Sequence, residues 1–345
     1  MRVQRAVAAV LLSLGAGCGQ AAVQRGVMGN PQVVWGLHQP GDSPLSSPAV
    51  PPELSFDGEG HQDRAEAFLA GSASLWPNAD HPKVVSHASR LRQEMHGSLR
   101  AGIERSGRYM EIIEREFVRE GVPVELAYLP IVESSFSHEA VGRGAVGLWQ
   151  FTAGTAKRYG LIVNREIDER RDPEKASRAA ARLLRDLYDR FESWDLAIAA
   201  YNAGPAPIER ALARNPGADF WKLADRGLLP GTTRQYVPKV LATALIASRP
   251  ERFGLSDVGR SEPLRYDTVV VSQRVDVATI ATLCGSSKTT VADLNPSLKA
   301  GVVPSMPSGY QVRLPEGTRE RFQVQYAEWR SGQGARESVP QRSSI

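Results

Sequence analysis

The sequence lacks the cysteines that a disulfide-stabilised fold requires. Only two of its 345 residues are cysteines, Cys18 and Cys284. Cys284 lies in the apolar stretch Ile280–Gly285, which favours a buried, inert thiol over a reactive one. We therefore expect a fold that does not depend on disulfide bonds.

The sequence also lacks a strong excess of charge of either sign. Its net charge is +4 and its pI is about 9.1. This mild basicity fits an anionic polymer or surface, but no block of Arg and Lys and no zinc-finger spacing indicates nucleic-acid binding. No cluster of metal ligands is present either, so neither a metal nor a cofactor is expected.

The apolar run at the N-terminus is too short to span a membrane. It covers Ala6–Leu14, follows the cationic segment Met1–Arg5 and leads through small residues to Cys18, a pattern typical of a secretory signal. The small residues resemble a lipoprotein processing box, in which Cys18 would become the lipidated first residue, although the usual Leu three positions earlier is Gly15. An ordinary cleaved signal peptide is the alternative. Gly19 after the cysteine favours outer-membrane sorting if lipidation occurs.

The rest of the chain divides into four segments after the signal at residues 1–18. Residues 19–80 are rich in Gly, Pro, Ser and Gln and predict a flexible tether. Residues 81–250 show helical periodicity and predict an all-helical domain. Residues 262–316 read as strand, two helices and strand, a small α+β module. The polar tail at 327–345 is predicted to be disordered.

Helix boundaries in the larger domain follow from apolar periodicity and from proline and glycine. The segments with helical spacing are 84–103, 109–117, 174–191, 194–201, 208–212 and 236–247. Pro123 restarts the chain at a first-turn position, and Pro130 should end or kink that helix. Glu133 should then lie at or just past a helix end. In the small module, the expected strands are 266–272 and 311–315, and the expected helices are 276–284 and 289–294.

Three short segments carry the polar groups that could do chemistry: Glu133–Ser135, Gly144–Phe151 and Ala199–Gly204. A carboxyl group after an apolar helix can be desolvated, which raises its pKa and suits it to act as an acid near neutral pH. Ser134 could orient it. Trp149 is expected in the core, whereas the amide of Gln150 must find partners, of which a polar substrate is one. Taken singly, each segment also has a structural explanation, such as helix capping by Asn202.

Together and in this order, the segments resemble the lysozyme-like domain of lytic transglycosylases of glycoside hydrolase family 23, and within it the membrane-bound D-type murein transglycosylases. The resemblance is carried by Pro123–Ser134, Gly147–Phe151, Asp168–Pro173, Ala199–Gly204 and Arg234–Lys239. It implies a mainly α fold, with a lysozyme-like (goose-type) catalytic domain. The small module partly resembles a degenerate LysM repeat, for which glycan binding and a purely structural cap are the two alternatives.

The resemblance also implies roles for individual residues. Glu133 would be the single catalytic acid/base and Ser134 a positioning group beside it. The implied substrate-binding residues are Ser134, Gln150, Tyr201, Asn202 and Tyr236, the last with its hydroxyl near the catalytic carboxyl. Two departures leave subsite preference open: Thr152–Ala153 replaces the usual Ile-Pro, and Thr232 replaces a common glutamate.

The implied mechanism needs only one acid, whereas a hydrolytic glycosidase ordinarily uses two. Protonated Glu133 would donate to the leaving oxygen, and the C6 hydroxyl would then close on C1 to give a 1,6-anhydro product. Asp168, Glu169 and Asp172 are interpreted as a loop and helix-start salt-bridge element and not as a second catalytic carboxylate.

The sequence therefore predicts a peptidoglycan lytic transglycosylase, a carbon–oxygen lyase that cleaves the MurNAc–GlcNAc β-1,4 bond. It should be secreted, anchored through Cys18 to the periplasmic face of the outer membrane or otherwise free in the periplasm, and monomeric. Its expected partners are glycan strands and the membrane, not nucleic acid. A hydrolase of the same fold, like goose-type lysozymes, and a non-catalytic cell-wall-binding protein are the alternatives.

Overall fold

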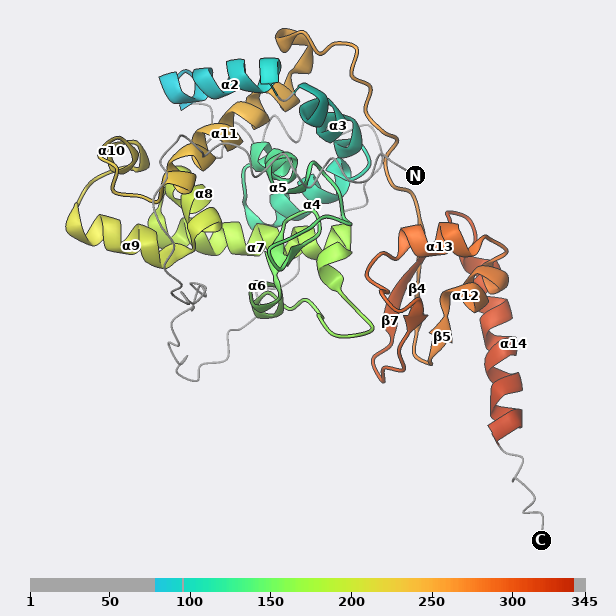
Figure 1. Cartoon of the computed structure of the whole chain (residues 1–345). Coiled ribbons are helices and arrows are strands. Elements are labelled where there is room, and N and C mark those ends of the chain that lie inside the picture. Colours follow the sequence, from blue (N-terminus) through green and yellow to red (C-terminus); the bar gives the residue numbers. More distant parts are fainter. Residues whose placement is uncertain (1–77, 95, 338–345) are drawn as a thin grey trace, which may run out of the picture. The chain divides into compact units, whose positions relative to one another are not determined.

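A computed structural model describes residues 78–94 and 96–337 of the chain. The predicted signal peptide, Cys18, most of the predicted tether and the last eight residues lie outside the described residues. Two groups of secondary-structure elements follow one another along the described part, a helical domain and a small α+β module (Figure 1). This arrangement confirms the predicted fold class.

The helical domain surrounds one apolar core, to which Phe117, Trp149 and Phe220 contribute fully buried rings. Its helices are α2 (Pro82–Glu94), α3 (His96–Ser106), α4 (Met110–Glu120), α5 (Leu129–Ser134), α6 (Ala153–Arg158), α7 (Pro173–Phe191), α8 (Trp194–Ala203), α9 (Pro205–Arg214), α10 (Phe220–Asp225) and α11 (Gly231–Ser248). Short 3-10 turns lie at η2 (Val124–Tyr128), η3 (Glu169–Arg171) and η4 (Pro250–Phe253). An antiparallel sheet of β1 (Val141–Gly142), β2 (Ala145–Val146) and β3 (Phe151–Thr152) interrupts the helices, so the prediction of an all-helical domain is wrong for this segment.

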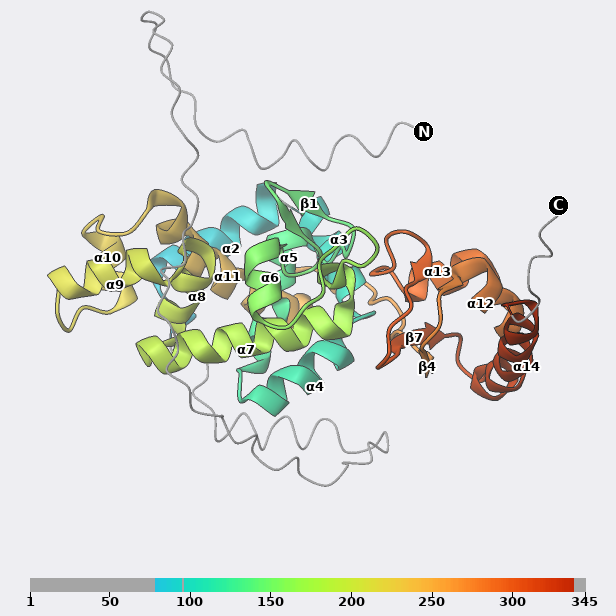
Figure 2. The same ribbon diagram turned by 90° about the horizontal axis from the view of Figure 1, so that it is seen from below.

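Helix α7 lies at the centre of this domain, with α4 and α8 packed against it (Figure 2). Asp172 caps its N-terminus by accepting hydrogen bonds from the backbone N–H groups of Glu174 and Lys175. Pro173 occupies the first position, where its missing N–H costs nothing. The side chains of Leu184 and other apolar residues at helical spacing are buried. Local sequence and packing therefore favour the same helix.

Two helix predictions differ from the structure. The segment 84–103 forms two helices, α2 and α3. Pro130 is predicted to end or kink a helix, but it lies in the first turn of α5 because residues 124–128 before it form the separate turn η2. A proline is tolerated there since first-turn N–H groups have no partner within the helix. Glu133 lies in the last turn of α5, as predicted.

The small module has its own apolar core. Strand β4 (Asp267–Val271) pairs antiparallel with β7 (Tyr310–Leu314), and β5 (Val275–Asp276) pairs with β6 (Val302–Val303). Helices α12 (Val277–Cys284) and α13 (Lys288–Leu294) lie between them in sequence, which confirms the predicted strand–helix–helix–strand order. Cys284 is buried, which confirms the predicted burial of its thiol, and burial raises the pKa of that thiol.

The prediction of disorder from Ala327 onwards is wrong for residues 327–337. Helix α14 (Arg319–Glu337) continues through this segment. Its aromatic side chains Phe322, Tyr326 and Trp329 stack in succession, and the first two are buried in the core of the module. Their spacing of four and three residues places them on one helix face, a stripe hidden by the polar composition around it.

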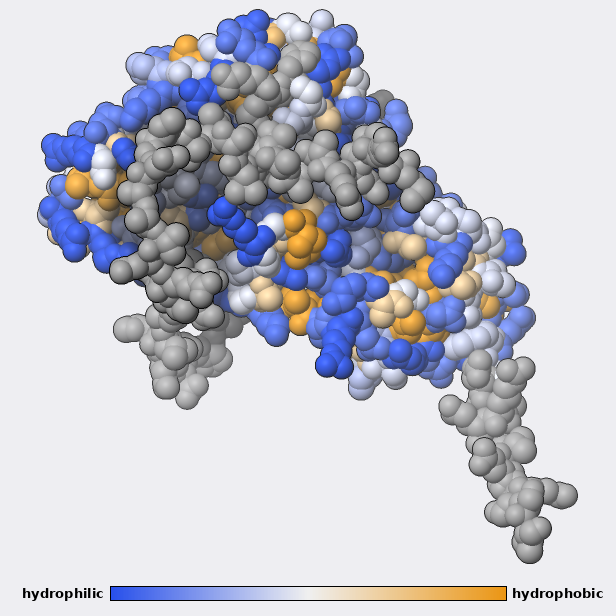
Figure 3. Space-filling model, in the orientation of Figure 1, coloured by the Kyte–Doolittle hydropathy of each residue, from blue (hydrophilic) through white to orange (hydrophobic). Residues whose placement is uncertain are grey.

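The face of the protein seen in Figure 3 is mostly hydrophilic, with small groups of hydrophobic residues between charged ones. None of the helices in the described part of the chain combines the length and hydropathy needed to cross a membrane.

Candidate active site

Glu133 meets a tyrosine from a distant part of the chain. The hydroxyl of Tyr236, in α11, donates a hydrogen bond to Oε1 of Glu133. Burial raises the pKa of Glu133 to about 7, although the Tyr236 hydrogen bond and the positive charge of Lys239 act in the opposite direction. A carboxyl group with this pKa is protonated in a large fraction of molecules at neutral pH, as a general acid must be.

The chain directly after Glu133 has an uncommon backbone conformation. Ser135 and Phe136 have positive φ angles of 50° and 59°. Such angles are disfavoured for residues with a Cβ atom, above all bulky ones, and persist only where packing enforces them. The ring of Phe136 is 1% exposed. Burial of this ring therefore fixes the sharp turn that ends α5 at the carboxyl group.

Ser134 connects α5 to the loop that follows β2. Its hydroxyl donates to the backbone oxygen of Leu148 at 2.8 Å, with the backbone oxygen of Pro130 at 3.2 Å. The structure thus gives Ser134 a contact with the neighbouring loop and none with the carboxyl group of Glu133. Ser134 therefore positions α5 against the loop at Leu148 and does not orient the Glu133 side chain directly.

Gln150 lies in the same loop, with a φ angle of 48°. Its amide nitrogen donates to the backbone oxygens of Ala140 (3.2 Å) and Gly147 (2.9 Å). The amide that could contact a substrate therefore also holds together the three-stranded segment 141–152, from β1 to β3, which is called the hairpin below. Within the described part of the chain, its Oε1 oxygen remains available as an acceptor. The ring of Trp149 beside it is fully buried, which confirms its predicted place in the core.

Tyr201 reaches the site from the end of α8. Its hydroxyl donates to the backbone oxygen of Trp149 at 2.7 Å. Burial, and then the negative charge of Glu133, raise the pKa of Tyr201 well above its ordinary value, so the two side chains are electrostatic neighbours. Asn202 is exposed and accepts a hydrogen bond from Thr233 at 3.0 Å. The structure thus brings Tyr201 and Tyr236 to Glu133, whereas Asn202 connects α8 to α11.

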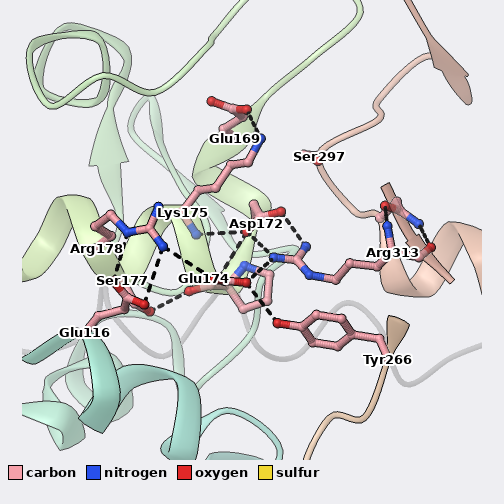
Figure 4. A network of polar contacts seen from close by, with 12 residues as sticks. Glu116, Glu169, Asp172, Glu174, Lys175, Ser177, Arg178, Tyr266, Ser297 and Arg313 are labelled. Carbon is pink, nitrogen blue, oxygen red and sulfur yellow. Dashed lines mark hydrogen bonds and ion pairs between the residues drawn. The ribbon is translucent and has the colours of Figure 1, made fainter. Parts of the chain in front are cut away.

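The three acids of the motif Asp168–Pro173 are paired with basic side chains. Asp168 pairs with Arg170 at 2.7 Å and Glu169 with Lys175 at 2.5 Å. Asp172 caps α7 and forms an ion pair with a residue of the small module (Figure 4). The interpretation of this segment as a salt-bridge element is confirmed. Among the described residues, no group of three or more His, Cys, Asp or Glu side chains is arranged to hold a metal ion.

Lys239 is the site residue to which the sequence assigned no role. It follows Tyr236 by three residues, so both side chains lie on the same face of α11. Burial lowers the pKa of Lys239, and the charge of Glu133 raises it in part. Within the described residues its side chain forms no ion pair, but its charge acts on Glu133. The i, i+3 spacing in the fourth motif was the signal that could have identified it.

This fold and site define a class of protein. Residues 110–224, which lie within the helical domain, match the family described as the Transglycosylase SLT domain. Residues 265–331 match the family described as the LysM-like domain of lytic transglycosylase MltD. Both resemblances predicted from the sequence, to the lytic transglycosylase domain and to a LysM-like module of the D type, are confirmed.

Two curated relatives match the chain with the same sequence identity and coverage. Over 201 residues the chain is 34% identical to the membrane-bound lytic murein transglycosylase D of Escherichia coli strain K12 and to that of strain CFT073. The alignment covers 56% of this chain and 44% of each relative, so the chain spans less than half their length. A solved structure of an inactive mutant of the lytic transglycosylase Slt from Pseudomonas aeruginosa matches at 27% identity, with a TM-score of 0.36. That match covers 41% of this chain and 24% of the other.

Proposed function

We propose that this chain is a peptidoglycan lytic transglycosylase in which Glu133 is the single acid/base. The observation that carries the proposal is one carboxyl group with a pKa of about 7, contacted by a tyrosine hydroxyl, while the acids of the neighbouring motif are held in ion pairs. A direct-displacement hydrolase would need a second carboxylate to activate water or attack the sugar. The match of residues 110–224 to the Transglycosylase SLT domain supports the same chemistry.

The first step is protonation of the leaving oxygen. Because Tyr236 donates to Oε1, the proton of neutral Glu133 is placed on Oε2. From there it transfers to the glycosidic oxygen between MurNAc and GlcNAc as the C1–O bond breaks. The acetamido group of the substrate stabilises the positive charge that develops at C1.

The second step is closure of the sugar on itself. The Glu133 carboxylate, now stabilised by the Tyr236 hydrogen bond and the charge of Lys239, takes the proton of the C6 hydroxyl. The C6 oxygen bonds to C1, which gives a 1,6-anhydro end and restores the protonated acid without water. Intramolecular attack suits this site because the nucleophile is already held near the reacting carbon.

The substrate contacts belong to the same proposal. The free Oε1 oxygen of Gln150, the Tyr201 ring and the exposed amide of Asn202 would bind the sugar and its N-acetyl group. The N-terminal sequence and the name of the membrane-bound relatives support secretion and a lipid anchor at Cys18, on the periplasmic face of the outer membrane.

Mass spectrometry of purified sacculi digested by the protein tests this function. We expect products lighter by one water than those of hydrolysis, and no such products from Glu133→Gln. Glu139→Gln, which alters an exposed carboxyl six residues away, should be as active as the parent. Reducing ends alone would indicate a hydrolase, and binding to sacculi without cleavage would indicate a wall-binding protein. Either result would refute the proposal.

A further inference from the structure

A buried ion pair holds the small module to the helical domain (Figure 4). Arg313 of β7 is 5% exposed, and its Nη1 and Nη2 donate to the two carboxylate oxygens of Asp172 at 2.5 and 2.8 Å. Its Nη2 also contacts Glu174 at 3.2 Å, and the same carboxylate accepts the hydroxyl of Tyr266 at 2.9 Å. Removal of one member of such a pair leaves a buried charge and is strongly destabilising. This contact therefore fixes the module in place.

Backbone contacts join the same two parts of the chain. The N–H of Asp168 donates to the backbone oxygen of Ser297 at 2.9 Å, and Ile167 forms an antiparallel bridge with Leu298. The side chain of Ile167 is 1% exposed and belongs to the apolar core of the module. The segment 166–172 of the helical domain is thus packed as part of the module.

Segment 166–172 also forms hydrogen bonds to the hairpin of the candidate active site. Arg170 is 8% exposed; its Nε and Nη2 pair with Asp168, and its Nη1 donates to the backbone oxygens of Gly144 and Phe151, both at 3.1 Å. The backbone of Gly147 packs directly against that of Arg170, so closely that a Cβ atom at Gly147 would lie 1.9 Å from the backbone oxygen of Arg170. One guanidinium therefore ties the hairpin to the docked segment.

The hairpin in turn contacts two residues of the candidate active site. The backbone oxygen of Leu148 accepts the Ser134 hydroxyl next to Glu133, and that of Trp149 accepts the Tyr201 hydroxyl. Direct contacts therefore run from the module through Asp168 and Arg170 to the hairpin, and from there to α5 and α8.

We propose that the C-terminal module is a positioning element of the active site and that Arg170 is the residue through which it acts. The sequence offered two roles for the module, glycan binding and a structural cap. Here the module has the structural role and in addition affects the rate of the reaction. The inference rests on the proposed function, since it assigns the module an effect on that reaction. The docked segment fixes Arg170, and Arg170 sets the loop against which Ser134 and Tyr201 are aligned.

Steady-state kinetics on soluble, uncross-linked glycan strands test the inference. Arg170→Lys keeps the charge but cannot reach one carboxylate and two carbonyls together, and we expect kcat to fall about tenfold or more with KM changed less than threefold. Arg313→Lys should lower kcat in the same way. The matched control is Arg274→Ala, which removes an exposed ion pair with Glu166 across the same interface and should change kcat less than twofold.

A double variant distinguishes a shared route from two independent defects. If Arg313 acts through Arg170, the fall in kcat of Arg170→Lys/Arg313→Lys should be clearly smaller than the product of the two single effects. Fully multiplicative effects would overturn the proposal, as would a wild-type kcat in Arg313→Lys.

Hydrogen exchange supplies a readout that needs no turnover. The N–H groups of Gly147 and Gln150 are bonded to the backbone oxygens of Ala140 and Gly147. In Arg313→Lys they should exchange faster, while the N–H groups of α8 keep their rates. Unchanged exchange in the hairpin would refute the positioning role even if the protein proved inactive on glycan, which separates this inference from the proposed function. If Arg313→Lys fails to fold, Tyr266→Phe, which removes one hydrogen bond to Glu174, replaces it. The same faster exchange in the hairpin, with unchanged rates in α8, is then expected.

Discussion

Replacement of Glu133 by glutamine is expected to stabilise the protein at alkaline pH while it abolishes the proposed activity. Burial raises the pKa of Glu133 from an ordinary 4.5 to about 7 in the folded chain. Between these values the folded state binds more protons than the unfolded state, so the free energy of unfolding falls as pH rises. Below pH 4.5 both states are protonated and the penalty is absent; above pH 7 it is complete.

The size of the penalty follows from the two pKa values. Their difference, at about 1.4 kcal/mol per pH unit, corresponds to on the order of 3 kcal/mol. The Glu133 side chain retains some contact with solvent, which reduces this to about 2 kcal/mol. Glutamine has nearly the same shape, keeps an oxygen that can accept the Tyr236 hydrogen bond and carries no charge.

Urea unfolding of the parent and of Glu133→Gln between pH 4 and pH 9 measures the effect. The variant should gain about 2 kcal/mol relative to the parent as pH rises through 4.5 to 7, and the gain should then level off. In the control Glu139→Gln, whose carboxyl is exposed, the difference from the parent should stay within about 0.5 kcal/mol throughout. A constant difference for Glu133→Gln across this range would refute the raised pKa and with it the choice of Glu133 as the acid.

Three further substitutions probe the same site. Tyr236→Phe removes a hydrogen bond that lowers the pKa of Glu133, so the alkaline limb of the pH–rate profile should move up by about one pH unit; a limb that moves down or stays would contradict this. Lys239→Gln removes a positive charge that also lowers this pKa, so the limb should move up again, with Lys239→Arg restoring the parental profile. Gly147→Ala places a Cβ atom 1.9 Å from a backbone oxygen and should lower stability by more than about 2 kcal/mol. Thermal unfolding measures this loss of stability. Gly144→Ala is the control, because Gly144 has the same φ angle of 84° but open space around the Cβ atom; the difference between the two variants gives the cost of the steric clash.

Several helices and the place of Glu133 at a helix end could be predicted from local sequence, because each signal is contained in a few residues. The apolar spacing in residues 174–191 and the prolines Pro123 and Pro130 before Glu133 are of this kind. The tail helix α14 was missed because three aromatic residues determine its packing among many polar ones. The contacts made by the Gln150 amide could not be anticipated, since they depend on a loop geometry with a positive φ angle that no local pattern specifies.

Glu133 and Asp172 show how long-range contacts give two buried acids opposite pKa shifts. Both are carboxyl groups at helix ends, and burial by itself would raise the pKa of each. Asp172 receives a buried guanidinium from Arg313, 141 residues away, and its pKa falls below the ordinary value. Glu133 receives only a phenol hydroxyl and a more distant ammonium, and its pKa rises. The module therefore keeps one acid charged and structural by pairing with it, and the acid without such a partner remains able to carry a proton. The long-range pairing that removes Asp172 from chemistry is the same contact that docks the module, so both depend on Arg313.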